Sequence, residues 1–124
     1  MKLLLDTHAA LWWLGDDERL GSASAALLDD ASNDVLLSAA VVWEVAIKRS
    51  LGKLKAPNGF ASTLVGAGAT ALPVTIAHAE AVELLGSHHR DPFDRMLIAQ
   101  ASVEQAVLIS NDQALLRYGV QLVW

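Results

Sequence analysis

The sequence predicts an α/β fold, in which helices cover both faces of a central parallel sheet of four to five short strands. Short apolar runs, too brief for helices, alternate along the chain with helix-forming segments, a pattern typical of a three-layer α/β/α sandwich. The 124 residues, of which 53% are hydrophobic, suffice for one buried core and leave no room for a second. We therefore expect residues 1–124 to form a single domain.

The first half of the chain predicts two buried strands, each followed by helices. The expected elements are a strand over 2–5, helices over 7–14 and 22–30, a strand over 35–38, and helices over 41–51 and 60–65. The first strand is an apolar run that Asp6 ends. Ser22 is placed to cap the second helix. Apolar residues at 43, 47 and 51 repeat every four positions, which lays them along one side of a helix.

The second half of the chain continues the alternation. The expected elements are a strand over 72–74, a helix over 76–85, a helix from 91 to about 105, a strand over 107–110, a short helix over 113–118 and a possible fifth strand over 122–124. Gly86 and Gly119 follow two of these helices, and glycine commonly ends a helix. Asp91 and Pro92 mark a helix start, because Asp caps free amides and Pro fits the first helical position.

The composition excludes several classes of site. The chain has no cysteine, which rules out disulfides, thiol nucleophiles and cysteine-ligated metals and fits the reducing cytoplasm, where we expect the protein to act. The four histidines do not have a zinc-binding spacing. Asp6 interrupts the apolar start and no run of 18 apolar residues occurs, so we expect neither a signal peptide nor a membrane span.

The net charge of -5 argues against a protein that coats nucleic acid through bulk electrostatics. The distribution of the charges along the chain is more informative than their sum. Within 44–55, Glu44 is the one acid beside four basic residues: Lys48, Arg49, Lys53 and Lys55. This strip is a candidate surface for a phosphate backbone. A solvated helix face explains it equally well.

Four acids occupy positions that a parallel sheet brings together. Asp6 directly follows the first strand, and Asp112 comes shortly after the fourth. Glu44 lies in the helix after the second strand, and Asp94 near the start of the helix before the fourth. Such positions crowd around the carboxyl edge of a doubly wound sheet, where ligands bind. Converging carboxylates repel each other unless a cation offsets them, and oxygen donors without sulfur suit Mg²⁺.

Each of these acids also has a purely structural explanation. Asp6 and Asp112 are placed to cap the helices that follow them, and Asp94 lies in a first turn where the helix dipole favours negative charge. Glu44 precedes Lys48 by four residues, the favourable order for a helical ion pair. The case for a metal site therefore depends on the four acids taken together.

Four segments, in order, resemble the PIN-domain ribonuclease toxins called VapC. They are LLLDTHAALWWL, LSAAVVWEVAIKRSLGKL, HHRDPFDRMLIAQA and LISNDQALLRYGV, and together they cover essentially the whole chain. The combination of DTH after the first strand, WE in the helix after the second, and DPFDRMLIAQA before the fourth is quite specific. The resemblance implies a PIN-like fold and a Mg²⁺-dependent endoribonuclease, with Mn²⁺ able to substitute.

The resemblance also implies a catalytic and metal-binding set: Asp6, Glu44, Asp94 and Asp112. Ser110 stands where the family usually has Thr or Ser. Asp91 lies one turn before Asp94 and is a second candidate for its role, although its place before Pro92 suits a cap better. The implied partners are an RNA substrate, a cognate VapB-type antitoxin and a second copy of the chain.

Several residues near these motifs are candidates for supporting roles. We interpret Thr7 as a local cap whose hydroxyl faces the acids, and His8 as lining the site. His89 and Arg90 precede Asp91 and are candidates for RNA contact, with a solvated loop as the alternative.

The adjacent residues Trp12 and Trp13 cannot both be buried on one helix face, so we expect one of them at a partner interface.

Two other functions place an acid after the first strand. Phosphate transfer on an aspartyl nucleophile is disfavoured, because dehalogenase-type enzymes need a second Asp where this chain has His8, and receiver domains need an acidic pair. A non-catalytic PIN-like binding module is disfavoured because all four acids are retained.

Overall fold

The computed structural model describes residues 1–87 and 91–124 and has a five-stranded, all-parallel sheet at its centre. The sheet order is β3-β2-β1-β4-β5. The strands are β1 (Lys2–Leu5), β2 (Asp34–Ser38), β3 (Thr70–Leu72), β4 (Val107–Ile109) and β5 (Leu122–Val123). The predicted α/β class is confirmed, and the fifth strand is present.

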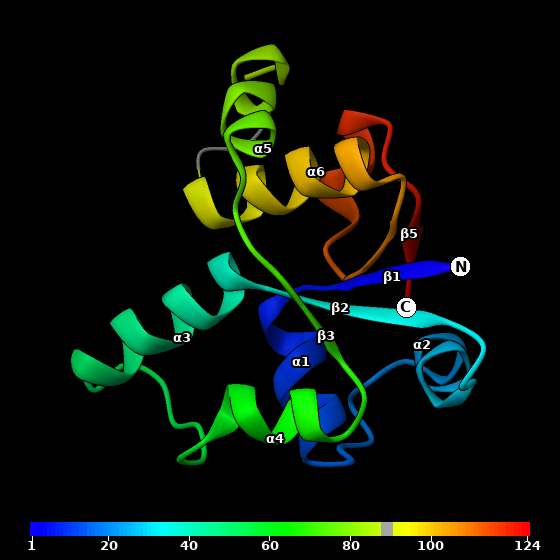
Figure 1. The fold of residues 1–124 in the computed structure, drawn as a ribbon, viewed down its shortest axis with the longest axis vertical. Coiled ribbons are helices and arrows are strands. Elements are labelled where there is room, and N and C mark those ends of the chain that lie inside the picture. The colour runs from blue at the N-terminus through cyan, green and yellow to red at the C-terminus, as the bar shows by residue number, and fades with distance from the viewer. Residues whose placement is uncertain (88–90) are drawn as a thin grey trace.

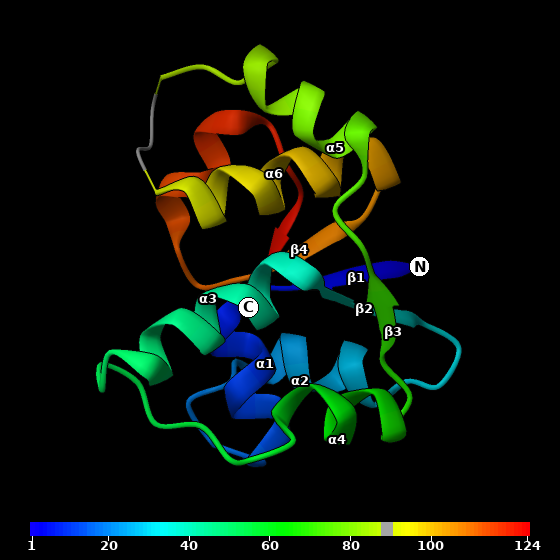
Figure 2. The ribbon, with the colours of Figure 1, turned by 60° about the vertical axis from the view of Figure 1, so that its left-hand side comes forward.

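Helices cover both faces of this sheet, which gives three layers (Figures 1 and 2). One face carries α5 (Ile76–Ala81), the short 3-10 segment η1 (Val82–Leu84), α6 (Pro92–Glu104) and η2 (Gln113–Tyr118). The other face carries α1 (Thr7–Leu14), α2 (Ser22–Asp29) and α4 (Phe60–Gly66). Helix α3 (Ala39–Ser50) lies beyond the end of β2 and packs against both α1 and α6.

The central strand β1 shows why the sequence reads as continuous apolar runs. Successive strand residues point to opposite faces of a sheet, yet Leu3, Leu4 and Leu5 are all fully buried, because helices cover both faces. Leu108 and Ile109 of the neighbouring β4 are fully buried for the same reason.

Two predicted segments of the second half of the chain differ from the structure. Strand β3 ends at Leu72 instead of 74, because Pro73 has no N–H to donate to the ladder. The helix expected over 76–85 is α-helical only to Ala81 and continues as the 3-10 segment η1. The short helix predicted over 113–118 has the predicted bounds and is a 3-10 helix.

A buried polar pair fixes α3 relative to α6. The hydroxyl of Ser38 accepts from the Ala40 amide at 3.0 Å, which caps α3, and donates to the side-chain oxygen of Gln100 in α6. Both Ser38 and Gln100 are fully buried, so neither can pair with water instead. This pair holds together the two helices that carry Glu44 and Asp94.

In the part of the chain that the structure describes, no helix combines the length and the apolar character needed to cross a membrane.

Candidate active site

The acidic residues gather where the strand order of the sheet reverses. From β1 the chain moves outward to β2 and β3, then crosses to β4 on the other side of β1 and ends at β5. Asp6 follows β1 and Asp112 comes three residues after the end of β4, so the two acids flank this switch point at the carboxyl edge. Doubly wound sheets bind their ligands at this location.

The helices bring the other two acids to the same edge. Helix α3 starts directly after β2, so Glu44, in the second turn of α3, stays close to the carboxyl edge. Helix α6 leads into the parallel strand β4 and must therefore run back along the sheet, which places its first turn and Asp94 at the carboxyl edge.

One cavity of about 210 Å³ is lined by all four predicted acids. Its lining residues are Asp6, Thr7, His8, Glu44, Lys48, Leu54, Asp91, Asp94 and Asp112. The structure thus brings together residues that are up to 106 positions apart in the sequence (from 6 to 112). Glu44 is buried, with 7% of its surface exposed, and the other acids are half-buried.

Three of the acids also cap helices, so the structural explanations are correct as well. Asp6 accepts from the Ala9 amide at 2.8 Å at the start of α1. Asp91 accepts from the amides of Phe93 and Asp94 at the start of α6, at 2.8 and 3.2 Å. Asp112 caps η2 in the same way. For Asp6 and Asp112, capping and clustering occur together because both follow from the position of a residue after a strand.

Two hydroxyl groups connect the acids to one another. The Ser110 side chain is fully buried, hydrogen-bonds to Asp6, and accepts from the Asp112 amide at 3.1 Å. The Thr7 hydroxyl donates to Oε1 of Glu44. Our interpretation of Thr7 as a local cap was wrong, because Asp6 caps α1 and leaves the Thr7 hydroxyl free to hold Glu44.

Lys48 contributes a positive charge to the acidic cavity. Its Nζ donates to Oε2 of Glu44 at 2.6 Å, one helical turn away on α3. This hydrogen bond raises the pKa of Lys48, and the nearby charges of Asp91 and Asp94 act in the same direction. The pairing expected from the four-residue spacing is therefore present, but inside the cavity rather than on an exposed helix face.

Burial perturbs the carboxyl group of Asp6. Burial raises its pKa above the usual 3.8, against the opposing effects of hydrogen bonds from Ser110 and Ala9. The neighbouring Glu44 charge also raises the pKa of Asp6. A half-buried carboxylate beside another carboxylate is an environment in which a bound cation would be favourable.

The donor set fits a hard divalent cation in its chemistry. All four predicted ligands are carboxylates in one cavity, and such oxygen donors suit Mg²⁺ or Mn²⁺. In the described part of the chain, residues 1–87 and 91–124, however, no three Asp, Glu or His side chains are close enough together to surround one ion. Glu44 instead has Thr7 and Lys48 as its partners.

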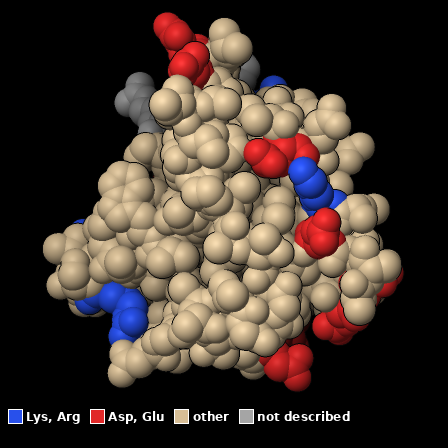
Figure 3. All heavy atoms as spheres, in the orientation of Figure 1, with Lys and Arg blue, Asp and Glu red and all other residues tan. Residues whose placement is uncertain are grey.

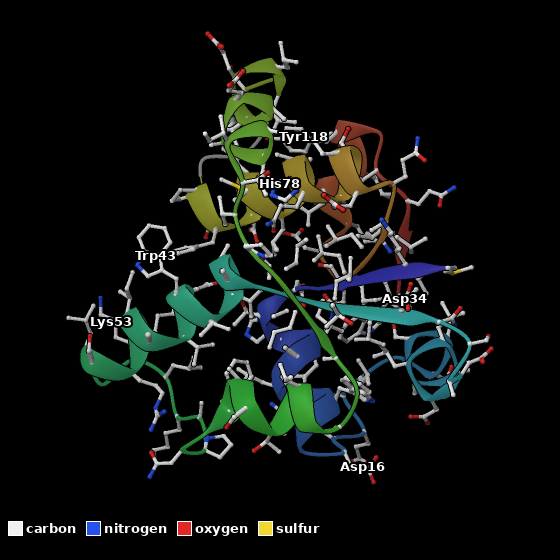
Figure 4. The ribbon with its side chains drawn as sticks, in the orientation of Figure 1. Asp16, Asp34, Trp43, Lys53, His78 and Tyr118 are labelled. Carbon is white, nitrogen blue, oxygen red and sulfur yellow. The ribbon has the colours of Figure 1, made fainter. Side chains whose placement is uncertain are left out.

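The structure separates the remaining predicted residues. His8 lines the cavity and stacks on Trp12, with ring centroids 5.2 Å apart. Arg49 points away from the acids and donates to Asn58 at 2.7 Å. Lys53 lies beyond the end of α3, outside the cavity lining (Figure 4). Arg90 and His89 are outside the described residues.

The partner interface expected at Trp12 or Trp13 stays a prediction. Trp12 and Trp13 are both half-buried and pack against the core, because α1 lies between the sheet, α4 and the C-terminal Trp124. The exposed tryptophan is Trp43, with 62% of its surface accessible, and its ring contacts Phe93 edge-on at 5.1 Å.

This aromatic pair was missed in the sequence. Trp43 directly precedes Glu44 and Phe93 directly precedes Asp94. Because Glu44 and Asp94 were expected to lie close together, their aromatic neighbours could have been expected to meet as well.

Comparisons with known proteins agree with this architecture. Residues 3–121 match the family model of the PIN domain. Ribonuclease VapC22 of Mycobacterium tuberculosis is 31% identical over 117 residues, which cover 91% of this chain and 88% of that protein.

Solved structures with the same fold include two VapBC structures. VapBC2 from Rickettsia felis, bound to a DNA fragment of its promoter, aligns with a TM-score of 0.73 at 16% identity and covers 99% of this chain and 98% of its own. DNA-bound VapBC from Salmonella typhimurium aligns with a TM-score of 0.72 at 16% identity, and the alignment covers 99% of this chain and 97% of that chain. At these identities the likeness concerns the fold.

The raised pKa of Asp6 predicts a pH-dependent advantage for Asp6→Asn in metal-free protein. Well below pH 3.8 the carboxyl is neutral in both folded and unfolded states, so the stabilities of parent and variant differ by a constant. As the pH rises toward the folded pKa, the unfolded state ionises first and the parent loses stability relative to the variant. Asn remains a good cap, so capping is kept.

Urea unfolding in chelator, from about pH 3 to about pH 7, measures this difference. Asp30→Asn is the control, because the Ser32 side chain lowers the pKa of Asp30 and reverses the sign. A gap between parent and Asp6→Asn that stays constant with pH would contradict the prediction.

Proposed function

Because this chain belongs to the PIN-domain family, as a member of the VapC type, we propose that it is a Mg²⁺-dependent endoribonuclease and the toxin of a type II toxin–antitoxin module. The observation that supports this most directly is the gathering of Asp6, Glu44, Asp94 and Asp112 around one cavity at the switch point of the sheet. We take residues 1–124 as one PIN domain, which acts in the cytoplasm, where its RNA substrates are.

The proposed reaction is hydrolysis of an RNA phosphodiester bond. Asp6, Glu44, Asp94 and Asp112 would hold the cation, with Mn²⁺ able to replace Mg²⁺. The chemistry that the bound ion supplies is activation of water and neutralisation of charge on the phosphate. Ser110 and Thr7 orient Asp6 and Glu44 through their hydroxyls, so these carboxylates are held in place before substrate arrives. No carboxylate needs to act as a nucleophile.

The RNA strand would approach along the end of α3. Lys48 is the basic residue that lies in the cavity lining, and its ammonium would contact a phosphate there. Arg49 and Lys53 lie further along α3 and beyond it, and we propose them as outer contacts to the backbone, together with Arg90. His8 is exposed at the cavity and backed by Trp12, which suits it for contact with a base or phosphate.

A VapB-type antitoxin is the proposed regulatory partner. The proposal is supported by the family, and by the fold that this chain shares with VapBC2 from Rickettsia felis and VapBC from Salmonella typhimurium. Growth arrest on expression of this chain, relieved by co-expression of its cognate antitoxin, would test it.

We also propose a homodimer, formed through an uncharged face around Trp43. Figure 3 shows a broad face with few charged side chains, over α5, β3, α3 and α4. Six of the large exposed apolar residues belong to these elements or the segments beside them: Trp43, Leu51, Val65, Val74, Ile76 and Leu84. Next to them a cavity of about 560 Å³ opens between α3, α5 and α6. Exposed apolar surface of this extent is typical of an interface, and a two-fold dimer is the commonest oligomer.

Cleavage of RNA is expected to require the divalent ion and the acids together. Asp6→Asn and Glu44→Gln keep the shape of each side chain but remove its charge, so each should lower the cleavage rate by orders of magnitude, as should excess chelator on the parent. Mg²⁺ should raise the melting temperature of the parent more than that of either variant.

Gel analysis of RNA fragments, with melting curves in parallel, measures both effects. Full activity in chelator, or unchanged activity and an unchanged Mg²⁺-dependent shift in both variants, would rule out the proposed site.

Asp91 and Asp94 are expected to separate into a cap and a ligand. Asp91 bonds two amides at the start of α6, so Asp91→Ala should destabilise the fold by about 1 kcal/mol and keep much of the activity. Asp94→Ala should retain the stability and lose the activity. Unfolding curves and cleavage rates of the two variants show which acid has which role, and reversed results would exchange the assignments.

The homodimer is expected to dissociate when its apolar face is charged. Ile76 is 78% exposed, so Ile76→Asp should change the stability of the monomer by no more than about 0.5 kcal/mol while placing a charge in the proposed interface. Light scattering should show a dimer for the parent and a monomer for the variant. Leu116→Asp, a change at another exposed apolar residue on η2, is the control and should stay dimeric. A parent that is monomeric at all concentrations would refute the proposal.

A further inference from the structure

Glu44 has a complete set of partners within the chain itself. Only 7% of its surface is exposed, and each of its two carboxylate oxygens is engaged: Oε1 by the Thr7 hydroxyl and Oε2 by the Lys48 ammonium at 2.6 Å. A buried carboxylate without such partners would be strongly unfavourable. The pairing therefore stabilises Glu44 when no other cation is present.

The Lys48 side chain has room to move out of this position. Its side chain is 44% exposed, and the long, flexible stem can carry the terminal ammonium into solvent. The Thr7 hydroxyl, by contrast, belongs to the first turn of α1, beside the buried strand β1. Of the two partners of Glu44, Lys48 is the one that can move away.

A divalent ion and the Lys48 ammonium would compete for the same oxygen. Both carry positive charge, and both would be attracted by the same acids, since Lys48 already interacts electrostatically with Asp91 and Asp94. Two like charges a few ångströms apart repel each other even in water. Occupation of Oε2 by the ion therefore favours departure of the ammonium.

We propose that Lys48 is a built-in counter-ion of Glu44, which holds the carboxylate in the metal-free protein and is displaced from it when the divalent ion binds. This inference depends on the proposed function, because it concerns the same metal site. It assigns to Lys48 a positioning role that sets how tightly the ion binds. The displaced ammonium stays at the cavity, where an incoming phosphate would meet it.

The test uses the full chain with Lys48→Met, which removes the charge and keeps an unbranched apolar side chain. The matched control is Lys53→Met, which removes the same charge from an exposed lysine just beyond α3 and outside the cavity lining. Melting curves in chelator report the metal-free protein, and calorimetric titration with Mg²⁺ or Mn²⁺ alone reports the affinity for the ion. Neither measurement depends on RNA cleavage.

The expected result has two parts of opposite sign. In chelator, Lys48→Met should melt at a lower temperature than the parent, because Glu44 has lost its ion-pair partner. It should bind the divalent ion more tightly, by about tenfold, because the ion no longer has to displace an ammonium whose attraction to the Glu44 carboxylate is appreciable even at the dielectric constant of water. Lys53→Met should match the parent in melting temperature and lie within about twofold of it in affinity, because exposed charges further away are screened.

The outcomes distinguish this inference from the proposed function. If the parent binds the ion and Lys48→Met binds it equally or more weakly, Lys48 is not a competing counter-ion and the inference is overturned, while the metal site stands. An equal gain in Lys53→Met would also overturn it, because the effect would then be one of net charge. If the parent binds no divalent ion, the metal site itself is refuted, and the inference with it.

Discussion

The repulsion between carboxylates at one edge of the sheet is the constraint to which most features of the site respond. Four acids line a cavity of about 210 Å³, and one of them, Glu44, is buried. Carboxylates in such positions must be paired, hydrogen-bonded or neutralised for the fold to be stable. The chain meets this need locally, with helix amides for Asp6 and Asp112, hydroxyls for Asp6 and Glu44, and an ammonium for Glu44. The acids can therefore be held together before any ion arrives.

The same interactions explain why structural and functional roles coincide in these residues. A residue that follows a parallel strand is both the natural cap of the next helix and a natural contributor to a ligand site at the carboxyl edge. Asp6 shows this most clearly: it caps α1, and burial raises its pKa. A cap found in the structure is therefore no argument against a ligand. A ligand differs from a mere cap in that neutralising its charge alters metal binding.

An acidic protein that acts on a polyanion has to place its positive charge carefully. The net charge is -5, yet Lys48 lies in the wall of the acidic cavity, while Arg49, the next residue, turns to Asn58 on another side of α3. Successive residues of a helix point about 100° apart, so only one of the two can face the acids. The basic strip of the sequence is thus divided between the site and the surface around it.

The sequence by itself determined the α/β class, the order of the elements and which four acids lie around the cavity at the carboxyl edge, because these depend on local patterns. Apolar runs mark buried strands, Asp91 and Pro92 mark the start of α6, and an acid after a strand is expected at the carboxyl edge.

Only the tertiary structure decided that Thr7 serves Glu44 rather than its own helix, that Lys48 faces the acids, and that Trp43 is exposed while Trp12 and Trp13 pack against the core. Each of these outcomes depends on which segments, distant in sequence, pack against a side chain, and the local pattern of the chain contains no record of such contacts.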